Sequence, residues 1–331
     1  MKRIAIIGGG SWGTALAVIA ARAGHDVQLW SRNPDVIHSI NEQRANSHYL
    51  KSVEIPSSVT ATSELVAALD DSKLVLFAAP SHAARELFTS IAPHLSDSAV
   101  IVSVAKGIEI ETGKRISEIV KEVIGTNHPF VCLSGPSFAK EVVNGHPTAI
   151  VAASIDTAAA RTVQNDLSFE NLRIYTNADV IGTEIGGSVK NVMAIAAGMA
   201  AGLGFGSNSV AALITRGLAE ITRFARREGA QVETLMGLAG LGDLVLTCTG
   251  ALSRNRFVGE ELGKGRRLEE ITAELNEVAE GIKTARAVKQ LADRASLEMP
   301  IVNEVNAVLY DGKSARDAVA ELMNRPLREE V

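Results

Sequence analysis

The stretch IAIIGGGSWGTALA, residues 4–17, decides the fold of the N-terminal half of the chain. It places Gly8, Gly10 and Gly13 in the spacing G-x-G-x-x-G, between an apolar run and an alanine-rich segment that ends near Gly24. In a strand–turn–helix of this kind the first glycine makes the tight turn, the second lets the backbone approach a pyrophosphate, and the third lets the helix pack on the strand. The N–H groups at the helix start face the phosphates. The stretch therefore predicts a dinucleotide site, with a glycine-rich turn between core elements as the alternative.

Polar residues after the next apolar run bear on the kind of dinucleotide. The stretch DVQLWSRN ends where an NAD site places an acid on the ribose 2′-hydroxyl, but it offers Ser31, Arg32 and Asn33 instead. A guanidinium can hold a 2′-phosphate through two hydrogen bonds, and the nearest acid, Asp35, lies beyond Pro34. The sequence therefore favours NADP over NAD, with a solvated surface arginine as the alternative for Arg32.

Apolar runs alternate with amphipathic segments through the first half of the chain, which is typical of a mostly parallel α/β sheet covered on both faces. Strands are expected at residues 3–7, 26–31, 74–79, 99–104, 130–134, 148–153 and 172–175. Helices are expected between several of them, at residues 12–23, 81–91, 116–124 and 157–167. The pattern predicts a Rossmann-type domain over residues 1–178.

After about residue 178 the strand signal fades and helical patterns take over, which predicts an all-α domain over residues 179–331. Ser314 is suited to cap the last helix and Pro300 suits a first turn, while Gly229 and Gly312 suit helix ends. The expected helices are at residues 185–201, 209–227, 233–238, 256–262, 268–275, 282–295, 299–310 and 315–324.

The composition argues against several classes of protein. The chain has 331 residues and a formal net charge of −5, which disfavours a dedicated nucleic-acid binder. Its longest run without a polar side chain, residues 192–206, falls short of the roughly 20 residues that span a bilayer, and its Ala and Gly content predicts a buried, closely packed helix. Cys132 and Cys248 have no Cys or His at metal-ligand spacing. We expect no metal site, and reduced core thiols in a cytoplasmic protein.

Two lysines are the best candidates for acid/base chemistry beside a nicotinamide, because the seven histidines lie in no persuasive motif. Lys106, in VIVSVAKGIE, comes just past an expected strand, at the edge where open α/β sheets bind ligands. Lys190, in EIGGSVKNVMAIAAG, leads into the apolar helix. Burial or a second cation would favour its neutral form and suit it to proton transfer, whereas a solvated charge at a helix start is the alternative. Asn191 is placed to orient substrate or the lysine.

The stretch GLGDLVLTCTGALSRNRF combines Asp243 with Ser253, Arg254 and Asn255 at an expected helix start. Hydroxyl, guanidinium, amide and helix N–H groups together suit a phosphate. A serine that caps the helix, followed by surface arginines, explains the same residues equally well. From this stretch alone, both interpretations stay open.

These motifs, in this order, resemble the bacterial NAD(P)-dependent glycerol-3-phosphate dehydrogenase family from end to end: IAIIGGGSWGTALA, VSVAKGIE, LSGPSFAKEV, EIGGSVKNVMAIAAG, GLAGLGDLVLTCTG, LSRNR and VAEGIKTA. The resemblance implies an enzyme that interconverts dihydroxyacetone phosphate and sn-glycerol 3-phosphate and supplies the glycerophospholipid backbone. It implies a nicotinamide cofactor and a helical domain that binds substrate and carries catalytic groups. Together with Arg32 it leads us to expect NADP(H) as the preferred cofactor, NAD(H) as a second, and no metal. We also expect a homodimer.

The resemblance further implies roles for individual residues. Lys190 matches the proton acceptor, Asp243 would hold it in place, and Lys106 would lie near both substrate and cofactor and help to tune Lys190. Substrate contacts are implied for Lys106, Gly135, Ser137, Lys190, Asp243, Ser253, Arg254 and Asn255. Cofactor contacts are implied for Gly8, Gly10, Ser11, Trp12, Gly13, Arg32, Asn33, Tyr49, Lys106, Ala139, Arg254, Val278 and Glu280. Position 33 often holds a basic residue in the family, so Asn33 slightly weakens the 2′-phosphate argument.

Two rival functions stay open. A β-hydroxyacid or 6-phosphogluconate dehydrogenase shares the architecture and an active-site lysine on a similar helix, although the SRN and VAKG segments favour a glycerol phosphate enzyme. A non-catalytic dinucleotide sensor would keep the glycine loop and lose the lysines, whereas Lys106, Lys190 and Asp243 are all present. Whether the helix at residues 192–206 is core or dimer interface is left undecided.

Overall fold

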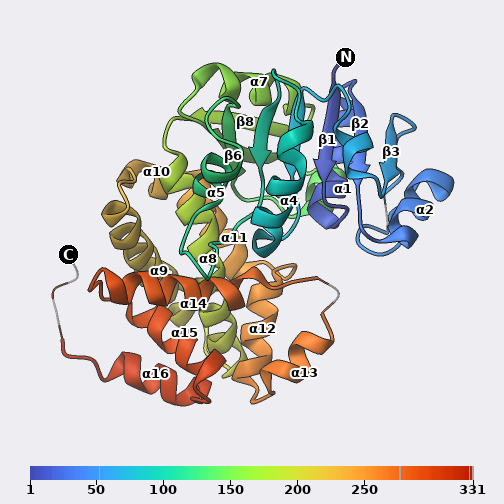
Figure 1. Cartoon of the computed structure of the whole chain (residues 1–331). Coiled ribbons are helices and arrows are strands. Elements are labelled where there is room, and N and C mark those ends of the chain that lie inside the picture. The colour runs from blue at the N-terminus through green and yellow to red at the C-terminus, as the bar shows by residue number, and fades with distance from the viewer. Residues whose placement is uncertain (52, 276, 328, 330–331) are drawn as a thin grey trace. The chain divides into compact units, whose positions relative to one another are not determined.

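The computed structural model describes residues 1–51, 53–275, 277–327 and 329, and the chain forms two compact units (Figure 1). The first unit comprises Met1–Lys106 and Lys114–Glu184, and the second comprises Gly107–Gly113 and Ile185–Val331. All named strands lie in the first unit, and the named elements that lie wholly in the second are helical. The predicted α/β sheet followed by a helical region is confirmed.

The first unit is built on an eight-stranded sheet with the order β3-β2-β1-β4-β5-β6-β7-β8. Neighbouring strands are parallel except β6 and β7, which are antiparallel. The strand order reverses between β1 and β4, and ligands of open α/β sheets bind at the carboxyl ends of the strands at such a point. The strands are β1 Arg3–Ile7, β2 Asp26–Trp30, β3 Val59–Thr62, β4 Leu74–Phe77, β5 Val100–Ser103, β6 Phe130–Ser134, β7 Thr148–Ala153 and β8 Leu172–Asn177.

The helices expected in this unit are present, with residues 81–83 of one forming a 3-10 turn. One strand and three α-helices were not expected, namely β3, α2, α3 and α6, nor was the short 3-10 helix Ala92–His94. The start of α2 carried a signal, because Asn33 caps the helix and Pro34 is its first residue. The helices are α1 Ser11–Arg22, α2 Pro34–Gln43, α3 Leu65–Leu69, α4 Ala84–Ile91, α5 Ile116–Val123, α6 Ala139–Val143 and α7 Thr157–Leu167.

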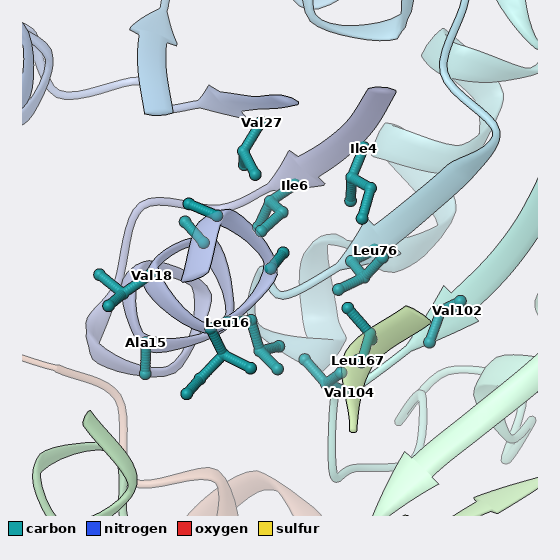
Figure 2. Packing of buried hydrophobic residues seen from close by; sticks show 14 of the residues in the cluster. Ile4, Ile6, Ala15, Leu16, Val18, Val27, Leu76, Val102, Val104 and Leu167 are labelled. Atoms are coloured by element: carbon teal, nitrogen blue, oxygen red, sulfur yellow. The ribbon is translucent and has the colours of Figure 1, made fainter. Parts of the chain in front are cut away.

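Helices cover both faces of the sheet, so β1 is buried on each side. Ile4 and Ile6 belong to one apolar cluster together with Leu16 of α1, whereas Ala5 and Ile7 belong to another. Figure 2 shows Ile4, Ile6 and Leu16 gathered in the first cluster. Alternate side chains of a strand point to opposite faces, and burial on both faces explains why β1 is a continuous apolar run. The core therefore fixes the end of β1, where the glycine loop begins.

The second unit contains most of α8, a 23-residue helix that begins in the first unit, and, among the described residues, eight further α-helices and the short π-helix Leu238–Gly242. The predicted helices are confirmed, with Ser314 capping α16 and Pro300 opening α15. Helix α11 was not expected. The helices are α8 Val180–Gly202, α9 Ser207–Arg227, α10 Val232–Met236, α11 Asp243–Thr249, α12 Arg254–Gly263, α13 Leu268–Ala273, α14 Glu280–Arg294, α15 Pro300–Tyr310 and α16 Ala315–Met323.

Helices α8 and α12 approach each other at backbone distance. A Cβ at Gly198 would lie 2.0 Å from the carbonyl oxygen of Arg256, and one at Gly259 would lie 1.9 Å from that of Ile195. Residues 192–200 are buried throughout. The prediction of a buried, closely packed helix is confirmed for these residues. No described helix has the length and apolar character needed to cross a membrane.

Candidate active site

The glycine loop connects β1 to α1, and its shape requires glycine at two positions. Gly8 has a φ of +128°, and a Cβ there would lie 2.7 Å from the backbone of Ala78. A Cβ at Gly13 would lie 2.0 Å from the carbonyl oxygen of Gly8. Gly10 is extended and immediately precedes α1. Bare backbone therefore leads into a helix N-terminus, an arrangement that fits a pyrophosphate.

Ser11 and Trp12, the first two residues of α1, are partly buried. The Ser11 hydroxyl donates a hydrogen bond to the carbonyl oxygen of Tyr49 at 3.0 Å. Asn46 lies behind this contact, fully buried, and bonds to both Gly9 and Tyr49. Asn46 lies in the polar stretch RANSHYL, which contains no motif, so the sequence gives no signal for this role.

Arg32 follows β2 and is exposed. Its guanidinium pairs with Glu86 of α4 at 2.9 Å and lies over the ring of Trp30, 5.6 Å from the centroid. In this structure Arg32 is thus a surface arginine paired with Glu86. A 2′-phosphate would have to replace Glu86 or bind beside it. Asn33 caps α2, since its side chain accepts a hydrogen bond from Asp35 N at the start of the helix.

Lys106, Gly135 and Ser137 form a cluster beyond the ends of β5 and β6. The Lys106 ammonium donates to the carbonyl oxygen of Gly135 at 3.1 Å, and the Ser137 hydroxyl donates to the same oxygen at 3.1 Å. Gly135 has a φ of +138°, which favours glycine. Ala139 begins α6 and packs against the core cluster around α1. A single carbonyl therefore orients both polar side chains.

Lys190 lies in the middle of α8 and is buried, with 5% of the residue exposed. Its ammonium donates to Oδ1 of Asp243 at 2.5 Å and to the hydroxyl of Thr247 at 2.7 Å. Asp243 opens α11 and Thr247 follows one turn later, so the two lie on the same face of the helix. The solvated alternative for Lys190 is wrong. A carboxylate this close favours the ammonium form of the lysine, the form that can give a proton.

Asn255 connects three segments of the second unit. Its Nδ2 donates to Oδ1 of Asn191 on α8 at 3.0 Å, and its Oδ1 accepts from the backbone N of Gly281 on α14 at 2.9 Å. Asn191 itself is buried and follows Lys190 directly. One N–H and the oxygen of the Asn255 amide thus connect the start of α12 to α8 and α14.

The remaining predicted residues surround the starts of these two helices. Ser253 caps α12 by accepting from Arg256 N, so the capping interpretation is confirmed for its hydroxyl. The Arg254 side chain is about half exposed and pairs with Glu277. Val278 is 40% exposed, and Glu280 is the first residue of α14. Arg254 therefore places a half-exposed guanidinium at the start of α12.

Both cysteines are free and buried, as expected. Burial raises the pKa of the Cys132 thiol well above its usual value, with the charge of Glu184 adding to the effect. Burial also raises the pKa of Cys248, to about 12. Neither thiol lies in an environment that would activate it as a nucleophile.

Each unit thus gathers its own part of the predicted set. The first brings together the glycine loop, Tyr49 and, separately, the cluster of Lys106 with Gly135 and Ser137. The second brings Asp243 to Lys190 and joins Asn255 to Asn191. The influence of Lys106 on Lys190 stays a prediction. Asn46 and Thr247 are the additions that only the folded chain reveals.

Comparison with known proteins gives a consistent result over the whole length. The family model "NAD-dependent glycerol-3-phosphate dehydrogenase N-terminus" matches residues 3–160, and the corresponding C-terminus model matches residues 179–320. A glycerol-3-phosphate dehydrogenase of Koribacter versatilis, named for NAD(P)+, is 53% identical, covering 100% of this chain and 99% of its own. One from Citrifermentans bemidjiense, also named for NAD(P)+, is 48% identical, covering 99% of each. The crystal structure of glycerol-3-phosphate dehydrogenase from Coxiella burnetii is similar with a TM-score of 0.95 at 39% identity, covering 98% of this chain and 99% of that one.

Proposed function

This chain belongs to the NAD-dependent glycerol-3-phosphate dehydrogenase family, and from that membership we propose that it interconverts dihydroxyacetone phosphate and sn-glycerol 3-phosphate. It is an oxidoreductase of a CH–OH group that uses NAD(P). The observation that carries the proposal within the structure is the buried Lys190–Asp243 pair, which places a proton donor in the helical unit. Its homologues over the full length favour this activity over a β-hydroxyacid dehydrogenase and over a non-catalytic sensor.

The glycine loop fits the pyrophosphate of the cofactor. Gly8 and Gly13 leave no room for a Cβ, so their backbone is bare, and the first turn of α1 offers N–H groups to an anion. Gly10, Ser11 and Trp12 belong to the same cradle, with Tyr49 held beside it by Ser11. A cofactor held by this loop would supply the hydride acceptor or donor for C2 of the substrate.

Lys190 supplies the proton in the reductive direction. Its ammonium donates a hydrogen bond to the C2 oxygen of dihydroxyacetone phosphate, and passes a proton to that oxygen as negative charge develops on it. In the oxidative direction the neutral amine accepts the hydroxyl proton. Asp243 and Thr247 hold the lysine nitrogen in place by two hydrogen bonds. No step requires a metal.

The substrate phosphate needs a cationic anchor away from the reacting carbon, and Arg254 at the start of α12 supplies it. The guanidinium now pairs with Glu277, a partner that a phosphate dianion would compete with. Ser253 and Asn255 shape this helix start, and we assign both to the substrate phosphate as well. We assign Lys106, Gly135 and Ser137 to the substrate as well, because Gly135 orients both polar side chains. Anchoring at a distance fixes the geometry of C2.

Cofactor contacts are also proposed for the groups beyond the loop. Arg32 would bind the 2′-phosphate of NADP(H), which makes NADP(H) preferred and NAD(H) a second cofactor. Asn33, Lys106 and Ala139 in the first unit, and Arg254, Val278 and Glu280 in the second, complete the proposed set. On this assignment the predicted N-terminal domain, residues 1–178, binds the dinucleotide, and the predicted C-terminal domain, residues 179–331, binds substrate and carries Lys190.

The remaining proposals concern the cell rather than the site. We propose a cytoplasmic homodimer that supplies the glycerophospholipid backbone. The two free, buried cysteines support a reducing compartment. Sedimentation of the purified protein would test the dimer.

A single assay tests the activity. The purified protein is mixed with NADPH and dihydroxyacetone phosphate, and the absorbance of the reduced nicotinamide is followed; the run is repeated with NADH. We expect rapid loss of absorbance that requires the phosphorylated ketone, with unphosphorylated dihydroxyacetone as the control. A protein that binds NADPH but consumes none with this substrate would instead be assayed on β-hydroxyacids.

A further inference from the structure

Asn46 is a fully buried polar residue in the loop that follows α2. It has 0% exposure, and an isolated antiparallel bridge pairs it with Leu50 at the other end of a short loop. This loop carries Tyr49, which the Ser11 hydroxyl contacts. A buried polar side chain of this kind must find partners for its donors and acceptors, and the identity of those partners shows what it positions.

Both ends of the Asn46 amide are used. Nδ2 donates to the carbonyl oxygen of Gly9 at 3.0 Å and to the hydroxyl oxygen of Thr14 at 2.8 Å. Oδ1 accepts from the backbone N of His48 at 3.3 Å and of Tyr49 at 3.2 Å. Two donors on one atom and two acceptor sites on the other are the property of an amide; neither a carboxylate nor a hydroxyl offers the same set.

The bond to Gly9 fixes the direction of the next N–H. In a trans peptide the carbonyl oxygen of Gly9 and the N–H of Gly10 point to opposite sides of the same plane. Asn46 and the Thr14 hydroxyl both hold the Gly9 oxygen from the protein interior. The N–H of Gly10 is therefore turned away from the interior, at the second glycine of the loop.

The other end of the amide completes a closed circuit. Asn46 holds Tyr49 N, the carbonyl of Tyr49 accepts from Ser11, and Ser11 begins α1 two residues after Gly9. The circuit thus ties the glycine loop to the segment that carries Tyr49. Moving any one member would disturb the others.

We propose that Asn46 is a positioning residue of the dinucleotide site, which turns the Gly10 N–H toward the pyrophosphate and holds the Tyr49 segment beside it. The inference rests on the proposed function, because it takes the glycine loop as the cofactor cradle. Asn46 does not act on the substrate, so its loss affects the cofactor and leaves the binding of dihydroxyacetone phosphate alone.

The Asn46→Asp variant tests this with almost no change in shape. As a carboxylate the new side chain has no donor and faces the Gly9 oxygen, so we expect the Kd for NADPH to rise about tenfold or more near pH 8. Toward about pH 5 the protonated acid regains an O–H donor, so the ratio of variant to wild-type Kd falls. Comparing the two proteins at each pH removes the titration of the 2′-phosphate itself.

Asn41→Asp is the matched control. Asn41 lies five residues away, and its amide also makes two hydrogen bonds. Both go to the backbone of Ala61 on β3 rather than to the glycine loop. We expect this variant to lose stability while its Kd ratio to wild type stays near one at every pH. An equal, pH-dependent loss of affinity in both variants would overturn the assignment.

The remaining outcomes are also decisive. Wild-type affinity for NADPH in Asn46→Asp across the pH range would refute the positioning role while the wild-type enzyme still reduces dihydroxyacetone phosphate. Failure of the wild-type protein to bind NADPH at all would refute the proposed function instead. If Asn46→Asp does not fold, Asn46→Ser replaces it, and a raised KM for NADPH with an unchanged KM for dihydroxyacetone phosphate is expected; an unchanged KM for NADPH contradicts the proposal.

Discussion

The ammonium of Lys190 lies 2.5 Å from Oδ1 of Asp243, and the two side chains are only 7% and 1% exposed. A buried charge pair is retained only where both partners are well hydrogen-bonded. Here Thr247 supplies the further bond, one turn after Asp243 on α11. The pair therefore keeps a cation at a defined place in the helical unit.

Replacing Lys190 by alanine should nearly abolish turnover, by roughly 10²- to 10⁴-fold, because the C2 oxygen loses its proton donor. NADPH binding, measured by titration of nicotinamide fluorescence, should stay intact. Lys289→Ala is the matched control, since Lys289 is a more exposed lysine paired with Asp293. Near-normal turnover of Lys190→Ala would remove the lysine from the mechanism.

Asp243→Asn keeps the shape and an acceptor but removes the charge beside Lys190. We expect kcat to fall by roughly 10- to 100-fold, the usual cost of losing a charge-assisted hydrogen bond. The Kd for NADPH should not change. Thr247→Val, which removes only the neutral partner, should cost less; a larger loss in Thr247→Val than in Asp243→Asn contradicts the ranking.

Arg32→Ala should weaken the binding of NADPH by roughly tenfold and that of NADH far less, because only NADPH carries a 2′-phosphate for a guanidinium to bind. The measurement is the ratio of the two dissociation constants. Arg173→Ala makes the same charge change at another exposed site of the first unit, over Tyr175, and should leave the ratio unchanged. Equal loss for both cofactors in Arg32→Ala refutes the 2′-phosphate assignment.

Glu220 should make the free energy of unfolding depend on pH. Burial raises its pKa from 4.5 to about 7, against the opposing effects of the Ile301 and Val302 N–H groups and of Arg223 and Arg325. The folded state holds this proton more tightly than the unfolded chain, so the contribution of protonated Glu220 to the free energy of unfolding is fully present below about pH 4.5. It is lost as the pH rises through about 7, by at most about 3 kcal/mol.

Glu220→Gln removes that titration, so its unfolding midpoint in urea should change less between pH 5 and pH 8 than the wild-type midpoint does. Glu233→Gln, at an exposed position of α10, is the control and should behave like wild type. Identical pH dependence in Glu220→Gln and wild type would show that another group titrates.

Gly259→Ala should lower the unfolding midpoint, since the new Cβ would lie 1.9 Å from the carbonyl oxygen of Ile195 and force α12 away from α8. Overpacking of this kind costs about 1–3 kcal/mol. Gly237→Ala adds the same atom at ordinary contact distance, 3.4 Å, in an extended conformation, and should be nearly neutral. Equal midpoints for the two variants would contradict close packing of α8 and α12.

The predicted parts of the fold are those with a strong local pattern. Strands β1, β6 and β7 agree with the prediction at both ends, because burial on both faces makes them continuous apolar runs. Strand β3, VTAT, was missed because it is four residues long and buries only alternate side chains. Helix α11, DLVLTCT, was missed because its β-branched, apolar residues have no helical periodicity of their own.

The site residues also separate into those that a sequence motif indicates and those that only tertiary contacts reveal. Motifs led to Lys190, Asp243 and the glycine loop, whereas Thr247 becomes visible only once α11 is known to be a helix that puts it on the face of Asp243. Asn46 depends on contacts with Gly9 and Thr14, more than thirty residues away, and no local pattern reports these. The bonds of Asn255 to Asn191 and Gly281 are likewise tertiary and invisible to a local pattern, while its contact with the substrate phosphate stays a prediction.

The inert cysteines make the protein a convenient carrier for a site-specific probe. Since the pKa of Cys132 is raised well above its usual value and that of Cys248 is raised to about 12, neither forms thiolate at neutral pH. A cysteine introduced at an exposed position, such as Met323→Cys at 79% exposure, would therefore be the single site that a maleimide fluorophore labels. Binding of cofactor and substrate could then be followed by fluorescence without first removing the native thiols.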